Sequence, residues 1–299
     1  MAGDPGADSS WVFSIVSGGI DGAAVRAAGG EAPEGVVVTG QRRTPEDSPR
    51  RNAVLSSLVE LSRELGSPER DAVILAEGNT SGDVDGKTFL LKASGFSLVT
   101  ATEESFVEMR TAAVLDLLDR PPRTDAELTT ALLACRAADG PRPSTEATLH
   151  ALALTLGGAT FVGHSHPTAV NSILCSQHAS ALAAGTLFPD HIVVCGHALL
   201  VPYVDPGVPL GLAVREGLRK HIELHGSPPK VIYLQNHGLI ALGHSPGDVL
   251  QVTAMAVKAA RVLLGTFAAG GPRFLPESEE ARIETRPDEH YRQQILAKT

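Results

Sequence analysis

The sequence predicts an α/β fold of the α+β type, in which helices cover both sides of a mostly antiparallel central sheet. Two observations support this prediction. Short apolar runs typical of strands are mixed with longer amphipathic stretches typical of helices, so both kinds of element share one core. Asp85-Gly86 stands directly before an apolar run, and an Asp-Gly tight turn joins antiparallel strands. A doubly wound parallel sheet is therefore disfavoured.

The first elements follow from periodicity and turn residues. Apolar residues recur on one helical stripe from Val54 to Leu65, and Gly66 is a natural helix stop. The runs at 72–75 and 88–92 are short and apolar, as strands are.

Helix caps and glycines define the next elements. The segment 124–127, T-D-A-E, is a capping-box signature that begins a helix reaching about residue 138. A second helical stretch runs over 144–156 and ends at Gly157-Gly158. Residues 159–163 then form a strand that leads into a pair of histidines.

The last third of the chain repeats these signals. The apolar runs 191–195 and 231–235 are interpreted as strands, with a helix over 208–225 between them. Ser245, Pro246 and Asp248 begin a long amphipathic helix to about residue 267, and one more helix is expected after Pro276.

The ends of the chain differ in composition. Residues 1–50 are dominated by small and turn-forming residues, and we expect an N-terminal extension that is loosely structured or used at a subunit contact. Residues 51–299 are expected to form one packed domain.

Composition narrows the function classes. The 299-residue chain has a formal net charge of −9 and no stripe of Lys and Arg, which argues against a nucleic-acid partner. No apolar run approaches the ~20 residues that span a bilayer, and the first ten residues do not form a signal peptide. Cys135, Cys175 and Cys195 lack a CxxC spacing and are interpreted as reduced, buried thiols. We therefore expect a soluble cytoplasmic protein with no membrane partner.

Histidines are the first candidate site residues. His164 and His166 stand at i and i+2 at the end of a predicted strand, so both imidazoles face the same side and could bind one divalent ion. The alternative is a pair of partly exposed loop histidines. His237, between two apolar segments, is a candidate third ligand, or else a core histidine satisfied by hydrogen bonds.

Small polar residues near these histidines suggest an anion site. Ser144, Thr145 and Glu146 open a predicted helix, so they are either a plain N-terminal cap or an anion site with an acid/base. The segments 77–82 and 92–95 present backbone N–H groups and hydroxyls for a phosphate, or are simply turns.

Taken together and in order, these motifs form a recognisable series. They are G-N-x-S at 78–81, K-x-S-G at 92–95, P-S-x-E at 143–146, H-x-H-P at 164–167 and N-H-G at 236–238. Over roughly residues 52–270 the chain resembles the class II aldolase/adducin family, the zinc-dependent sugar-phosphate aldolases typified by L-fuculose-1-phosphate aldolase. That family also holds a ribulose-phosphate epimerase, a methylthioribulose-phosphate dehydratase and the head domain of adducin.

The resemblance implies roles for particular residues and a class II aldolase-like three-layer fold. By match to the family motifs, His164, His166 and His237 are the zinc ligands and Glu146 is the catalytic acid/base. The implied cradle for the substrate phosphate is Asn79, Ser94, Gly95, Ser144 and Thr145. Lys92 stands where typical aldolases have an uncharged residue, and is either a local cation or a solvated strand-end lysine. Tyr291 is a candidate for the tyrosine that another subunit contributes in some family members, or else packs on the surface.

The resemblance also implies a reaction. It predicts a zinc-dependent lyase that cleaves a ketose phosphate into dihydroxyacetone phosphate and an aldehyde through a metal-stabilised enediolate, in a homotetramer. The alternatives are a decarboxylase or dehydratase using the same site, or a non-catalytic adducin-like domain. Glu146 argues against the epimerase, which has Asp there, and three retained histidines argue against adducin. The residues of the motifs are more similar to those in the aldolase portion of bifunctional rhamnulose-phosphate enzymes. The long spacing between residues 95 and 143 departs from the compact fuculose-type enzymes, so the identity of the substrate stays open.

Overall fold

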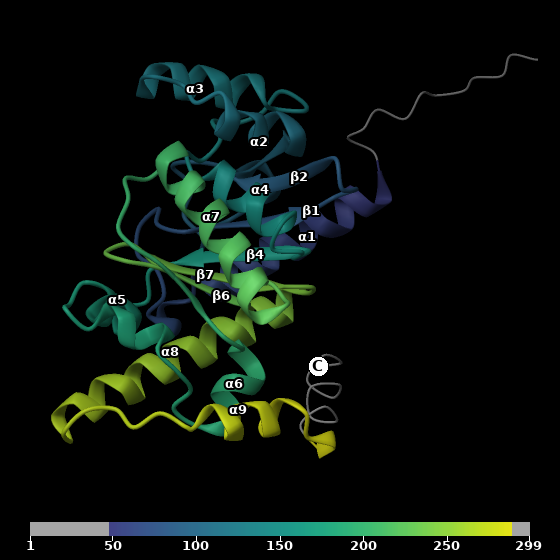
Figure 1. The fold of residues 1–299 in the computed structure, drawn as a ribbon. Coiled ribbons are helices and arrows are strands. Elements are labelled where there is room, and N and C mark those ends of the chain that lie inside the picture. Colours follow the sequence, from purple (N-terminus) through teal and green to yellow (C-terminus); the bar gives the residue numbers. More distant parts are fainter. Residues whose placement is uncertain (1–47, 289–299) are drawn as a thin grey trace, which may run out of the picture. The chain divides into compact units, whose positions relative to one another are not determined.

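A seven-stranded sheet forms the centre of the computed structural model, which describes residues 48–288, and its strand order is β3-β2-β1-β4-β7-β6-β5 (Figure 1). The strands are β1 Asn79–Asp83, β2 Thr88–Lys92, β3 Phe106–Arg110, β4 Phe161–Ser165, β5 Leu199–Val201, β6 Val231–Leu234 and β7 Gly238–Gly243. All neighbouring strands are antiparallel except β5 and β6, which are parallel.

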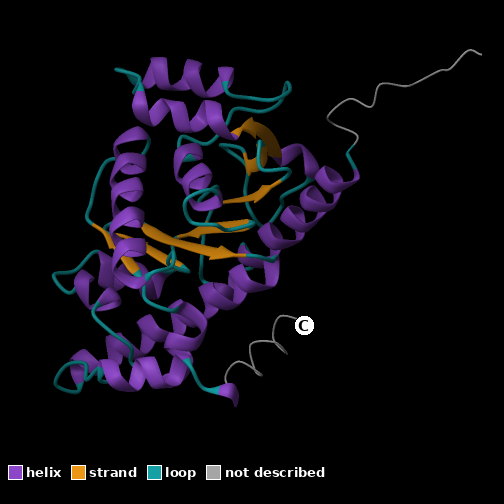
Figure 2. Ribbon diagram, turned by 45° about the vertical axis from the view of Figure 1, so that its right-hand side comes forward, coloured by secondary structure: helices purple, strands orange, loops and turns teal. Residues whose placement is uncertain are grey.

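Helices cover both faces of this sheet (Figures 1 and 2). They are α1 Pro49–Leu65, α2 Thr111–Asp119, α3 Asp125–Ala134, α4 Ala147–Leu154, α5 Thr168–Leu174, α6 Pro189–Cys195, α7 Val208–His225, α8 Pro246–Ala268 and α9 Glu277–Glu284. Short 3₁₀ turns lie at Pro68–Arg70, Glu103–Ser105 and Ala179–Ala183. α1, α5, α6 and α8 pack on one face, and α2, α4 and α7 on the other. The predicted architecture, a mostly antiparallel sheet between helical layers, is confirmed.

Side chains that point alternately to the two faces of the sheet contribute to two separate hydrophobic cores. In β6, Val231 and Tyr233 join the core beneath α8, whereas Ile232 and Leu234 join the core beneath α7. Because both faces are buried, β6 and β7 contain only apolar residues and glycine instead of alternating with polar residues.

α8 combines a strong start signal with a buried stripe. The Ser245 hydroxyl accepts a hydrogen bond from the Asp248 backbone N–H, and Asp248 in turn accepts from the Ser245 N–H, as the predicted capping box requires. Within residues 48–288, α8 is also the one helix long and apolar enough to cross a membrane by length and composition. Its apolar stripe lies instead against β7, α5 and α6.

Two predicted strands are wrong. Residues 72–75 form no strand: Leu75 has a positive φ of 52°, Ile74 and Leu75 are exposed, and the Ala72 carbonyl accepts a hydrogen bond from the His166 N–H. Residues 191–195 belong to helix α6, because Pro189 occupies its first turn after an extended Phe188.

Three smaller expectations also change. The segment 79–82 is not a turn but part of β1, paired with β2 and β4. Both helices predicted over 124–138 and 144–156 are shorter than expected. The first is α3, which ends at Ala134, and the second is α4, which begins at Ala147. Cys135 and Cys195 are buried as expected, but Cys175 is exposed. Most of the predicted extension, residues 1–47, and Tyr291 lie outside the described residues, so those expectations and the domain division remain predictions.

Candidate metal centre and active site

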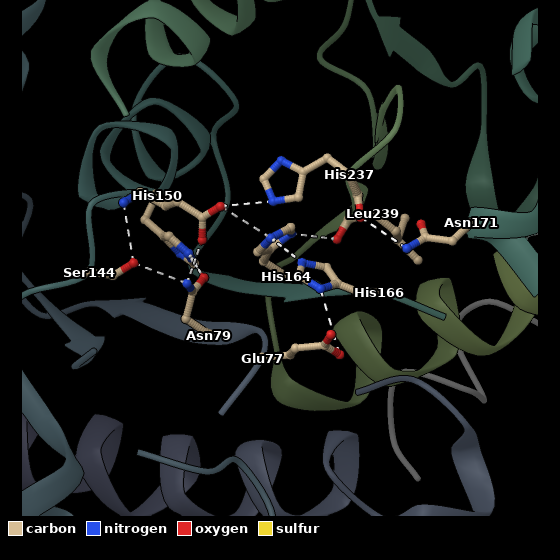
Figure 3. Close-up of polar contacts among 10 residues, drawn as sticks. Glu77, Asn79, Ser144, His150, His164, His166, Asn171, His237 and Leu239 are labelled. Carbon is tan, nitrogen blue, oxygen red and sulfur yellow. Dashed lines mark hydrogen bonds and ion pairs between the residues drawn. The ribbon is translucent and has the colours of Figure 1, made fainter. Parts of the chain in front are cut away.

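Three histidines from separate parts of the chain lie together at one end of the sheet (Figure 3). His164 lies in β4, His166 follows the end of that strand, and His237 occupies the turn between β6 and β7. Their ring centroids are 4.8 to 5.2 Å apart. One nitrogen from each ring falls within 4.8 Å of the other two, so the trio could hold a metal ion.

Neighbouring groups orient these rings. The Nδ1–H of His164 donates to the Leu239 carbonyl at 3.0 Å, which turns Nε2 toward His166 and Glu146. The Nδ1 of His166 lies 3.7 Å from a carboxylate oxygen of Glu77. The turn that carries His237 is held by Asn171, whose side-chain N–H donates to the His237 carbonyl at 3.0 Å.

The geometry fits a zinc ion better than it fits three isolated imidazoles. The Nε2 atoms of His164 and His166 are 3.0 Å apart, and two ring nitrogens at that distance repel unless a proton or a cation lies between them. Imidazole nitrogens are common zinc ligands, and three of them leave coordination positions free for a substrate. These residues therefore match the donor set of a catalytic zinc site.

Gly238 leaves the space that this arrangement needs. A Cβ at this position would lie 2.6 Å from His166 Cδ2 and 2.6 Å from the Ser165 carbonyl oxygen. The histidine pair can therefore approach the start of β7 only because residue 238 has no side chain.

Gly238→Ala is expected to lower the free energy of unfolding by about 1–3 kcal/mol, because either the backbone or the His166 ring must move. Zinc affinity should fall with it. Gly247→Ala is the matched control, since the nearest atom to its Cβ would be 3.7 Å away, and the change should stay below about 1 kcal/mol. Urea denaturation of both variants measures the difference, and equal stabilities would contradict the steric explanation.

Glu146 directs its carboxylate at the histidines. It immediately precedes α4 but makes no side-chain cap to that helix, so the plain-cap alternative does not describe it. Its Oε1 lies 3.1 Å from His237 Nε2 and 3.4 Å from His164 Nε2, and Oε2 accepts a hydrogen bond of 2.7 Å from Asn79 Nδ2. Burial raises the pKa of Glu146, but the charge and hydrogen bonds of His164 and His237 outweigh it and hold the pKa well below its usual range.

The predicted phosphate residues divide into two groups. Asn79 and Ser144 are buried beside Glu146, where Ser144 Oγ accepts hydrogen bonds of 3.2 Å from Asn79 Nδ2 and from the Glu146 N–H. Thr145, Ser94 and Gly95 are exposed. The Ser94 N–H donates to the carbonyl of Arg142 at 3.0 Å, which joins the two loops but uses that amide.

Lys92 is not a solvated lysine. Its side chain is almost fully buried, and its ammonium donates to the Phe96 carbonyl, so it ties down the loop that carries Ser94 and Gly95. Burial lowers the pKa of Lys92 to about 8, although the negative charge of Glu146 acts in the opposite direction.

Some residues near the site had no individual predicted role, although Glu77 and Ser81 belong to the 77–82 segment that was a candidate for phosphate binding. His150 and Ser81 are buried next to Asn79, and Glu77 lies beside His166. One signal was present: His150 follows Glu146 by four residues, a spacing that places both on one face of a helix.

Glu77→Gln is expected to weaken zinc binding about 10-fold, the lower end of the effect of losing a carboxylate that orients a metal-binding histidine. Competition with a chromogenic chelator measures the affinity. An unchanged zinc affinity would show that the 3.7 Å approach of Glu77 to His166 does not orient the ring.

Comparison with known proteins places this geometry in a family. A 28% identical relative over 244 residues is the "Uncharacterized oxidoreductase YuxG" of Bacillus subtilis (strain 168); the match covers 76% of this chain, which spans about a third of that protein (33%). The N-terminal class II aldolase domain of a conserved Thermoplasma acidophilum protein is similar in structure, with a TM-score of 0.57, 24% identity, and coverage of 74% of this chain and 96% of that one.

A further solved structure shares the fold. The L-fuculose-1-phosphate aldolase of Thermus thermophilus has a TM-score of 0.51 and 18% identity, with coverage of 75% of this chain and all (100%) of that one. The sequence model of the Class II Aldolase and Adducin N-terminal domain matches residues 56–264, a range that includes the three histidines and Glu146. This protein therefore belongs to the class II aldolase and adducin N-terminal domain family.

Proposed function

We propose that this protein is a zinc-dependent lyase that cleaves a ketose phosphate into dihydroxyacetone phosphate and an aldehyde. The observation that carries the proposal is the carboxylate of Glu146 beside three converging imidazoles. An adducin-like binding domain would need neither the carboxylate nor the imidazoles.

Each group has a task in this reaction. His164, His166 and His237 would hold the zinc ion. When bound, zinc supplies Lewis-acid polarisation of the substrate carbonyl and stabilises the negative charge left after cleavage. As the C3–C4 bond breaks, its electron pair stays on C3, and the C4 hydroxyl gives its proton to the Glu146 carboxylate as the aldehyde leaves. Glu146 then gives a proton to C3, and takes it back in the reverse direction.

The loops around Glu146 would bind the phosphate. Thr145, Ser94 and Gly95 are exposed on the two loops that the Ser94–Arg142 hydrogen bond joins, and the Ser144 hydroxyl still has its own proton to donate. Hydroxyls and loop amides of this kind bind phosphate oxygens. The buried Lys92 adds a positive charge below one loop.

A decarboxylase or dehydratase acting on a sugar acid or ketose phosphate is the second candidate. The segment between Gly95 and Ser144 suggests it, because this segment holds β3, α2 and α3 and is longer than the resemblance to fuculose-type aldolases implies. It would use the same histidines and Glu146, because all these reactions develop negative charge next to a carbonyl.

A screen of the zinc-loaded protein tests these alternatives. Ketose 1-phosphates and sugar-acid phosphates are the substrates, and release of dihydroxyacetone phosphate, CO2 or water-loss products is followed. Release of dihydroxyacetone phosphate supports the lyase, CO2 or a dehydrated product supports the second candidate, and no turnover with stoichiometric zinc argues against both. Sedimentation in the same buffer tests whether the protein is the homotetramer that the family resemblance implies.

A further inference from the structure

We propose that His150 is a positioning residue, which acts as a neutral imidazole with its proton on Nε2 to fix the amide of Asn79 and so to aim Glu146 at the metal centre. This inference rests on the acid/base function proposed above for Glu146. His150 lies one turn after Glu146 in α4 and touches none of the three metal-binding imidazoles by hydrogen bond.

A buried chain of hydrogen bonds runs from Ser81 through His150 and Asn79 to Glu146, and Figure 3 shows His150 beside Asn79. Ser81 Oγ lies 2.6 Å from His150 Nδ1, and His150 Nε2 bonds to Asn79 Oδ1. Asn79 Nδ2 then donates to Glu146 Oε2 at 2.7 Å. The chain thus runs from the middle of β1, through α4, back to the first residue of β1 and on to the carboxylate.

The chemistry of the end group determines the direction of every bond in the chain. An ionised carboxylate can only accept, so Asn79 must present its NH2 group to Glu146 and its carbonyl oxygen to His150. His150 must therefore donate from Nε2. Its Nδ1 then carries a lone pair, which accepts the hydroxyl proton of Ser81.

Burial protects this chain of hydrogen bonds from competition with water. His150 is 1% exposed, Ser81 is fully buried and Asn79 is 5% exposed, so water does not compete for their hydrogen bonds. Burial, with the nearby His164 acting in the same direction, lowers the pKa of His150 to about 3, so the ring is neutral at physiological pH. Both ring nitrogens are used, which leaves none for a metal ion.

As a result, the two carboxylate oxygens of Glu146 make different contacts. Asn79 holds Oε2, while Oε1 faces His164 and His237. If the Asn79 amide turned over, its carbonyl oxygen would face the carboxylate, and the two acceptors would repel. His150 prevents that rotation, because its Nε2–H has no other acceptor in the chain of bonds.

Two substitutions at His150 separate positioning from packing. In His150→Gln the side-chain NH2 lies where Nε2 was, so the donor to Asn79 is kept, whereas His150→Asn reaches only as far as Nδ1 and loses that donor. The probe is exchange of a carbon-bound proton of dihydroxyacetone phosphate in deuterated buffer with saturating zinc. We expect His150→Gln to stay within about 10-fold of wild type and His150→Asn to lose about 10²-fold in kcat with KM unchanged, the lower range of an acid/base contribution.

A measurement that needs no turnover tests the tautomer directly. Nitrogen-15 NMR of the wild-type protein should show His150 neutral with the proton on Nε2, and a protected Asn79 NH2 signal that disappears in His150→Asn. Ser81→Ala, which removes the donor to Nδ1 with little change of volume, serves as a second variant if His150→Asn fails to fold, and should lose that protection in part.

The two proposals fail in different ways. If wild-type protein exchanges no proton of dihydroxyacetone phosphate, the lyase function fails, and the NMR result alone decides the role of His150. A proton on Nδ1, an Asn79 signal unchanged in His150→Asn and Ser81→Ala, or a His150→Asn variant as active as His150→Gln would each overturn the positioning role.

Discussion

His237→Ala is expected to lose bound zinc and the proposed lyase activity while the protein stays folded. The imidazole of His237 supplies one of the three nitrogens that converge in the centre, and the two histidines that remain cannot complete a zinc site. Losing a group that merely orients a ligand costs 10–100-fold in affinity, so losing the ligand should cost more than about 10²-fold. The fold should persist, because the turn is held through the backbone carbonyl of residue 237, which alanine retains.

Metal analysis after dialysis and circular dichroism measure these two outcomes on the same sample. His244→Ala is the matched control, because His244 is an exposed histidine that lies outside the trio, and it should keep its zinc. Undiminished zinc in His237→Ala would refute the ligand assignment.

The parts of the fold that the sequence predicted well are those with a strong local signal. Ser245, Pro246 and Asp248 define the start of α8 by backbone capping alone, and Asp85-Gly86 defines the turn before β2. Each signal depends on residues adjacent in the chain, so no knowledge of tertiary contacts was needed.

The two wrong strands have a common physical cause. Residues 72–75 and 191–195 are both short apolar runs, and such a run is equally compatible with a strand, a helix or an exposed loop. The first follows a path set by contacts with distant groups, such as the hydrogen bond from His166 to Ala72. The second becomes helical because Pro189 begins a helix, a signal that the interpretation of the apolar run alone did not use.

The candidate site could be predicted only in part for a related reason. His164, His166, His237 and Glu146 were identifiable because their residue types and order resemble a family. The contact between Asn79 and His150 was not identifiable, because it depends on which strands pair and on how α4 lies across them. Strand register places Asn79 opposite His164, and no periodicity in the sequence reveals that pairing.

Glu146→Gln is expected to keep zinc at saturating concentration but to slow proton exchange at the carbon next to the substrate carbonyl by about 10²–10⁴-fold. Glutamine has the same shape but cannot take up a proton as a carboxylate does. Zinc should be retained, because the three residues that would hold the ion are histidines and do not include Glu146. Exchange of dihydroxyacetone phosphate protons in deuterated buffer, followed by proton NMR, measures the step directly.

Glu77→Gln supplies the matched control, since it makes the same chemical change in the other carboxylate near the histidines. It should weaken zinc binding yet exchange protons at the wild-type rate once zinc is saturating, the opposite pattern to Glu146→Gln. This opposition separates a group that moves a proton from a group that orients a ligand. Wild-type exchange in Glu146→Gln would remove Glu146 from the reaction, and the proton would then need another carrier close to the three histidines.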